Sequence, residues 1–94
     1  MRPSVSLARH REEVLQVLSR YGVRNPQVFG SVARGDDTEG SDLDLLVDFG
    51  NPPTYFDIFE IENELSELLG CRVEIGTKLR PHAAIVAADE LRPL

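Results

Sequence analysis

GSVARG at residues 30–35 and GSDLDLLV at residues 40–47 decide the fold of this 94-residue chain. The first stretch follows a short apolar segment and has the residues of a turn, whereas the second alternates polar and apolar residues as strands do. Alternate residues of a strand share a face, so Asp42 and Asp44 point the same way, with Cα atoms roughly 6.6 Å apart. The apolar residues between and beyond them point into the core. The pattern therefore predicts a strand with an acidic face beside a glycine turn.

This combination of residues suits a phosphate ligand and its metal. Two carboxylates at that spacing can converge on one Mg²⁺, or bridge two ions about 3.5–4 Å apart. Gly30 lets the backbone approach a ligand closely, and the amides of the next helical turn, with the Ser31 hydroxyl, favour anionic oxygens. The alternatives are that Asp42 and Asp44 form a solvated strand edge and that Ser31 only caps the turn after it.

Two further charged residues are candidates for the same site. Arg34 could contact a phosphate, or could pair with one of the aspartates that follow it. Glu74 is expected on a neighbouring strand, where it could act as a third metal ligand. Alternatively, Glu74 pairs with a nearby base, Arg72 or Lys78.

Around these stretches the sequence predicts one α/β (α+β) domain over residues 1–94, with a small three-stranded mixed sheet packed with helices. The capping box of Thr54 and Asp57 begins a long helix that Gly70 ends. Tyr55, Phe56 and Phe59 are expected to seat this helix on the sheet, or else to extend an apolar partner surface. The other expected elements are a helix over 4–21, strands at 27–29, 42–48 and 71–75, a helical turn at 32–34, and a last short helix from Pro81 in which Ile85 and Leu91 face inward.

Composition narrows the partners and the setting. The formal net charge is −6 and the pI is about 4.8, which disfavours direct binding to DNA or RNA. No apolar run is long enough to span a membrane. The single cysteine, Cys71, cannot form an internal disulfide and favours a reducing, cytoplasmic setting. His10 and His82 have no partner at zinc-ligand spacing.

Taken together, the Gly30-Ser31 turn, Arg34-Gly35 and Ser41–Asp44 resemble the signature of the DNA polymerase β-type nucleotidyltransferase superfamily. The short chain and the run from Asp42 to Val47 are similar to the minimal nucleotidyltransferase (MNT) branch of that superfamily. The resemblance covers nearly the whole chain, from the first helix to the third strand. Either motif alone is a weak signal, whereas both at one strand–turn–strand unit form a strong one.

The resemblance implies roles for individual residues. Gly30 and Ser31 would hold the β- and γ-phosphates of ATP, with Arg34 near them, and Asp42 and Asp44 would bind Mg²⁺ at the reacting phosphate. Glu74 would be the third catalytic acid and metal ligand, where the family usually has aspartate. The rate of phosphoryl transfer depends mainly on the positions of the reacting groups. The longer side chain of Glu74 is therefore expected to affect turnover more than nucleotide binding.

The resemblance also implies a biological setting. Stand-alone MNT proteins resemble antitoxins that act with a HEPN-type ribonuclease toxin, to which they transfer AMP, typically on tyrosine. One alternative is a non-catalytic module that neutralises its partner by stoichiometric contact, as Glu74 in place of aspartate would suggest. The other is a small-molecule transferase of the aminoglycoside type, whose acceptor pocket would require oligomerisation.

Overall fold

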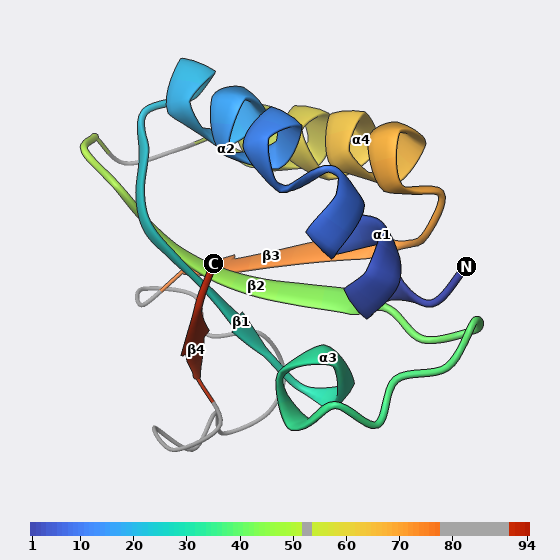
Figure 1. The fold of residues 1–94 in the computed structure, drawn as a ribbon. Coiled ribbons are helices and arrows are strands. Elements are labelled where there is room, and N and C mark those ends of the chain that lie inside the picture. The colour runs from blue at the N-terminus through green and yellow to red at the C-terminus, as the bar shows by residue number, and fades with distance from the viewer. Residues whose placement is uncertain (52–53, 78–90) are drawn as a thin grey trace.

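The computed structural model describes residues 1–51, 54–77 and 91–94 (Figure 1). Helices and strands alternate along the chain, as the sequence predicts for the α/β class, and the class is confirmed. The elements are α1 (Pro3–Arg9), α2 (Arg11–Arg20), β1 (Val23–Phe29), α3 (Ser31–Arg34), β2 (Leu43–Phe49), α4 (Tyr55–Leu69), β3 (Val73–Thr77) and β4 (Arg92–Pro93).

The strands form a mixed sheet in the order β3-β2-β1-β4. β1 runs antiparallel to β2 and β4, whereas β2 runs parallel to β3. In the part of the chain that the structure describes, the sheet therefore has four strands and not the predicted three. The extra strand is Arg92–Pro93, which pairs with Gln27 and Val28. Two residues are too few to show the alternation by which a strand is recognised in a sequence.

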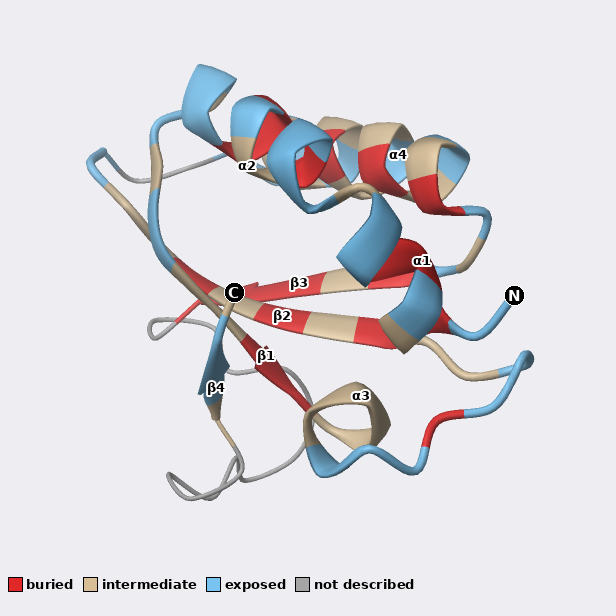
Figure 2. Ribbon diagram, viewed as in Figure 1, coloured by how far each residue is buried: buried red, intermediate tan, exposed pale blue. Residues whose placement is uncertain are grey.

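Three helices, α1, α2 and α4, cover one face of the sheet (Figure 1). The core lies between these two layers, and buried and half-buried residues alternate along β2 (Figure 2). Leu43, Leu45 and Val47 point into this core and are at most 1% exposed. They meet Ile61 and Leu65 of α4 there. The apolar face predicted for this strand is therefore present, whereas β2 begins at Leu43 and Asp42 lies one residue before it.

The single helix predicted over residues 4–21 is wrong, because the chain breaks at His10. His10 has non-helical φ and ψ of −115° and 21°, so α1 ends at Arg9 and α2 begins at Arg11. The break lets α1 pack differently from α2: the buried Ser6 hydroxyl donates a 2.6 Å hydrogen bond to the carbonyl of Leu69, at the end of α4. Helical periodicity alone does not reveal such a bend.

Several other boundaries differ from the sequence prediction. β1 begins at Val23 because an irregularity between Arg24 and Gln27, with Asn25 at φ 49°, accommodates the Asn25-Pro26 pair inside the strand. β3 runs over Val73–Thr77 and not from Cys71. The predicted helix from Pro81, with Ile85, lies outside the described residues, whereas Leu91 is half-buried.

The first turn of α4 combines one confirmed and one wrong prediction. The capping box is present: the Thr54 amide donates to Asp57 Oδ2 at 3.0 Å, and the Asp57 amide donates to Thr54 Oγ1 at 3.1 Å. Tyr55, Phe56 and Phe59 do not seat the helix, since they are 70%, 66% and 60% exposed. Aliphatic side chains fill the sheet-facing stripe of α4 instead. No helix within the described ranges has the length and apolarity that a membrane span requires.

Candidate nucleotide and metal site

The turn after β1 begins with a glycine that no other residue could replace without strain. Gly30 has φ 75° and ψ −151°, and its carbonyl accepts the Arg34 amide at 3.1 Å to close the short helix α3. A β-carbon on Gly30 would lie 2.6 Å from Oδ2 of Asp44. The turn therefore runs directly against the Asp44 carboxylate, and glycine is needed both for its backbone conformation and for the space.

The register of the sheet brings the third acid next to Asp44. On the central strand β2, Asp44 pairs with Phe29 of β1 on one side and with Glu74 of β3 on the other. Neighbouring strands are about 4.8 Å apart, and paired residues point to the same face. The end of β1, Asp44 and Glu74 therefore lie side by side, on the face opposite the helical layer.

Asp42 is the last residue of the loop that leads into β2. The Thr38 amide donates to Ser41 Oγ at 2.8 Å and the Ser41 amide donates to the Thr38 carbonyl at 3.0 Å, which holds the loop in a tight turn. Asp42 is half-buried, and its carboxylate accepts no hydrogen bond from the described residues. It is thus in a position to accept a cation.

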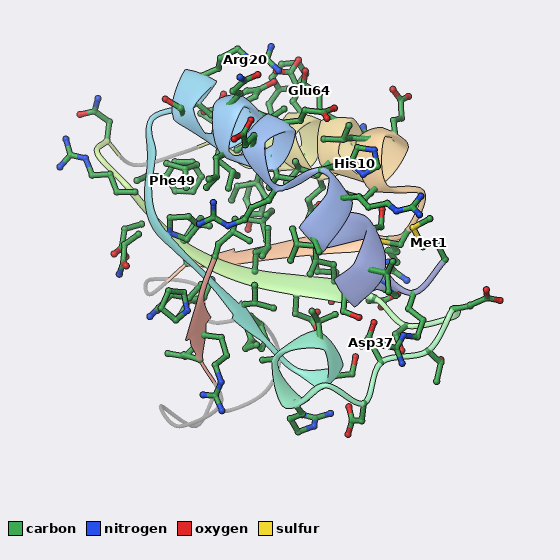
Figure 3. The ribbon with its side chains drawn as sticks, viewed as in Figure 1. Met1, His10, Arg20, Asp37, Phe49 and Glu64 are labelled. Atoms are coloured by element: carbon green, nitrogen blue, oxygen red, sulfur yellow. The ribbon has the colours of Figure 1, made fainter. Side chains whose placement is uncertain are left out.

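Asp37, which the sequence did not single out, fixes the same loop to α1. Its side chain is 2% exposed, and Oδ2 accepts the Ser4 amide at 2.9 Å (Figure 3). Burial alone would raise the pKa of Asp37, but hydrogen bonds from Ser4 and the charge of Arg2 together lower it. The sequence does not indicate which of the two adjacent aspartates, Asp36 or Asp37, is buried.

The free thiol of Cys71 lies near the same loop. Burial, with the nearby charges of Asp42 and Asp37, raises the pKa of Cys71. The thiol therefore stays protonated at neutral pH, as expected of a packed cysteine and not of a nucleophile.

The two remaining candidates, Glu74 and Arg34, form ion pairs. Glu74 Oε1 lies 3.4 Å from Nη2 of Arg72, which is one of the alternatives that the sequence left open. Arg34 Nε donates to Oδ2 of Asp36 at 3.4 Å. Across residues 1–51, 54–77 and 91–94, no three acidic, histidine or cysteine side chains converge on one point as metal ligands. A three-acid metal site thus stays a prediction.

The residues nevertheless fit Mg²⁺ and a triphosphate. Asp42 and Asp44 supply the hard oxygen donors that Mg²⁺ prefers, and Mg²⁺ commonly takes only one or two carboxylates beside phosphate oxygens. The turn at Gly30 and Ser31 brings backbone amides within reach of Asp44, where phosphates would lie. The Glu74 side chain is only 21% exposed, and its exposed partner Arg72 can move away without disturbing the core.

Comparison with known proteins shows the family to which this chain belongs. Residues 7–92 match the family described as Nucleotidyltransferase domain. Protein adenylyltransferase MntA of Thermococcus cleftensis is 43% identical over 72 residues, which are 77% of this chain and 70% of that protein. A solved structure provisionally described as a minimal nucleotidyltransferase is 44% identical, with a TM-score of 0.70, and the match covers 79% of this chain and 76% of the other.

A crystal structure of a toxin–antitoxin with AMP-PNP shares the fold. Its TM-score is 0.74 at 16% identity, over 87% of this chain and 69% of the other chain. The chain belongs to the nucleotidyltransferase domain family and is a nucleotidyltransferase. Within that family it is a minimal nucleotidyltransferase similar to the MntA adenylyltransferases. The resemblance identified from the GSVARG and GSDLDLLV stretches is confirmed.

Proposed function

We propose that this protein transfers AMP from ATP to a tyrosine hydroxyl of a partner protein, with Mg²⁺, and thereby acts as the antitoxin of a HEPN-type ribonuclease toxin. Its setting would be the reducing cytoplasm. The relative named protein adenylyltransferase MntA supports the transfer of AMP to protein, and the structural relative solved as a toxin–antitoxin supports the partner class. The whole of residues 1–94 would act as one domain.

In this proposal the chain's own residues orient the triphosphate and hold the attacking group. Gly30 amides and the Ser31 hydroxyl bind the β- and γ-phosphates, with Arg34 beside them, and Asp42 and Asp44 hold Mg²⁺, which supplies charge neutralisation at the phosphates. The tyrosine oxygen bonds to the α-phosphorus while the bond to the bridging oxygen breaks, and pyrophosphate leaves with that electron pair. The tyrosine proton goes to the carboxylate of Glu74.

One observation carries the proposal: the contact between the Gly30 turn and the Asp44 carboxylate. This contact supports the proposal, because adenylyl transfer requires phosphate-binding amides and a metal ligand next to one another. A glycine turn or an acidic strand alone would have many explanations. Their direct contact, at a position where only glycine fits, has few.

The Arg72–Glu74 ion pair favours the alternative of a non-catalytic module. If Glu74 stays paired with Arg72, no carboxylate is left to accept the proton of the attacking hydroxyl. The same domain would then neutralise its toxin by contact, with ATP bound as a structural ligand or not bound at all.

Incubation of the protein with α-labelled ATP, Mg²⁺ and the protein encoded by the adjacent gene tests the proposal. We expect label on a tyrosine of that protein, and loss of labelling with Asp42→Asn or Asp44→Asn. Asp48→Asn is the matched control, since Asp48 shares the strand but lies roughly 13 Å from Asp44. A tight complex without label would support the non-catalytic module, and neither label nor complex would contradict both.

A further inference from the structure

Three aromatic side chains are exposed at the start of α4. Tyr55, Phe56 and Phe59 keep 60–70% of their surface in contact with solvent, and we call them the aromatic patch. Scattered apolar residues are normal on a protein surface, but three large rings on two consecutive helical turns form a contiguous apolar surface. The sheet-facing stripe of α4 is already filled by Ile61, Leu65 and Leu69, so the core formed by the described residues does not bury the patch.

An acidic groove lies beside the aromatic patch. A cavity of about 320 Å³ lies between α4 and the end of α2, lined by Tyr21, Glu60, Asn63, Glu64 and Glu67. α4 contains no lysine or arginine to balance these acids. Arg20 contacts Glu64 at 3.2 Å across the groove (Figure 3). Three carboxylates on one helix surface with one such cation give the groove a negative potential.

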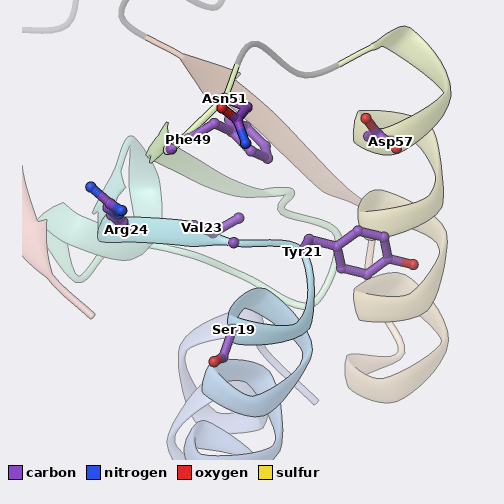
Figure 4. A pocket seen from close by; sticks show the side chains of 9 residues that line it. Ser19, Tyr21, Val23, Arg24, Phe49, Asn51 and Asp57 are labelled. Atoms are coloured by element: carbon purple, nitrogen blue, oxygen red, sulfur yellow. The ribbon is translucent and has the colours of Figure 1, made fainter.

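A second cavity continues from the acidic groove on the other side of Tyr21. It has a volume of about 420 Å³, and Val23, Phe49 and Asp57 are among the residues that line it (Figure 4). Tyr21 lines both cavities. Its lining is mixed, because Arg24, Asn51 and Asp57 stand beside the rings of Phe49 and Tyr21. The acidic groove is therefore bounded by Tyr21 and does not depend on this second cavity.

From these features we propose that the aromatic patch and the acidic groove bind a basic amphipathic helix of a partner protein. The helix would place apolar side chains on Phe56 and Phe59, and lysines or arginines against Glu60, Glu64 and Glu67. The negative charge of the groove favours a basic helix as the ligand, because the carboxylates repel nucleic acid and anionic lipid. A second copy of this chain, with a net charge of −6, would bring like charge.

This surface is separate from the nucleotide and metal site. α4 lies on one face of the sheet, whereas Asp44 points to the other, since its neighbours Leu43 and Leu45 point into the core beneath α4. A partner held by the aromatic patch would leave the Gly30 turn uncovered. The inference therefore goes beyond the proposed function and requires neither ATP nor the acid pair.

A pair of synthetic helical peptides tests the proposal. One carries a leucine stripe flanked by arginines, and its twin has glutamate in place of each arginine. We expect the arginine peptide to bind the intact protein and to shift the amide NMR signals of residues 55–67 and of Tyr21, while the glutamate peptide does not bind. No binding of the arginine peptide, shifts confined to other elements, or equal binding of both peptides would overturn the proposal.

Matched variants separate a specific surface from general attraction to an acidic protein. Phe56→Ser with Phe59→Ser, and separately Glu60→Lys with Glu67→Lys, should each weaken binding about tenfold or more. Glu12→Lys with Glu13→Lys changes the net charge equally at exposed positions of α2 and should weaken binding less than about twofold. Equal loss in both charge-reversed pairs would contradict the groove. Self-association that Phe56→Ser abolishes would identify a second copy as the occupant instead.

Discussion

Gly30 and Asp44 lie so close together that a β-carbon on Gly30 would be 2.6 Å from Oδ2 of Asp44. The glycine turn and the acidic strand are therefore one structural unit. Gly35, five residues later, has a similar φ of 79° but nothing within 4 Å of its would-be β-carbon. The two glycines thus share a positive φ, but they differ in ψ, −151° against 15°, and in their contact with the acid.

This difference gives the first prediction. Gly30→Ala should abolish AMP transfer and destabilise the fold by about 1–3 kcal/mol more than Gly35→Ala, because only at Gly30 must Asp44 move. Thermal unfolding of both variants, with and without Mg²⁺ and ATP, measures the effect. The nucleotide should stabilise Gly35→Ala but not Gly30→Ala. Equal behaviour of the two variants would mean that the contact with Asp44 is unimportant.

The Arg72–Glu74 ion pair gives the second prediction. Arg72→Gln should remove this ion pair and should lower stability by less than about 1 kcal/mol, since the pair is largely exposed on its arginine side. If Glu74 takes the tyrosine proton, Arg72→Gln and Glu74→Asp should keep or raise the rate of AMP transfer, and Glu74→Gln should lower it. The rate of labelling measures this. Unchanged labelling in Glu74→Gln would remove Glu74 from the site.

Asp37 gives a prediction on acid stability. Its folded-state pKa lies below the usual 3.8, so its contribution to stability is present above about pH 3.8 and is lost as the pH falls through the lowered pKa. Asp37→Asn should therefore cost about 1–3 kcal/mol at neutral pH, and the difference from wild type should shrink in acid. Urea unfolding at a series of pH values measures it. Asp36→Asn, at an exposed ion pair, is the control and should change little.

β3, an end strand of the sheet within the described residues, gives a prediction on association. Side chains of α4 accept its outward-facing amides: Glu62 Oε2 accepts from Ile75 at 2.9 Å, and Ser66 Oγ accepts from Val73 at 3.2 Å. Glu62→Ala should cost about 1–3 kcal/mol and should increase self-association through the exposed edge. Sedimentation and thermal unfolding measure the two effects. Glu67→Ala, on the same helix, should show neither.

The features that the sequence predicted are those determined by residues close together in the chain. The parity of Asp42 and Asp44 follows from strand geometry, and the capping box of Thr54 and Asp57 from helix chemistry. Contacts between distant residues determine the rest. The bend at His10 accompanies the Ser6–Leu69 hydrogen bond, and Asp37 is buried by its contact with Ser4, 33 positions away. No local pattern predicts either contact.

The aromatic residues of α4 illustrate the same limit. Five apolar positions in the segment Tyr55–Ile61 spread over more than one face of a helix, so their spacing does not determine which of them meet the sheet. The sheet buries Ile61 and leaves Tyr55, Phe56 and Phe59 exposed. The alternative that the sequence left open, an apolar partner surface, is what their exposure favours.

Tyr21 gives the last prediction, because its phenol lies between two carboxylates of α4. Its hydroxyl donates to Oε2 of Glu60 at 3.5 Å, at the limit of a hydrogen bond. Hydrogen bonding to Glu64, then burial and the charges of Glu64 and Glu60, raise the pKa of Tyr21 from 10.0 to about 12. The protonated phenol therefore contributes stability below about pH 10, which is lost as the pH rises through about 12.

Tyrosinate absorbance should show a titration midpoint near 12 for Tyr21. The Tyr21→Phe variant should lack this transition. Glu64→Gln should lower the midpoint more than Glu60→Gln, because Glu64 has the larger influence on the phenol. A midpoint near 10 for the transition that Tyr21→Phe removes, or a larger effect of Glu60→Gln, would contradict this order. The two glutamates line the acidic groove. A bound arginine peptide should therefore also lower the midpoint, because its positive charges offset the carboxylates beside the phenol.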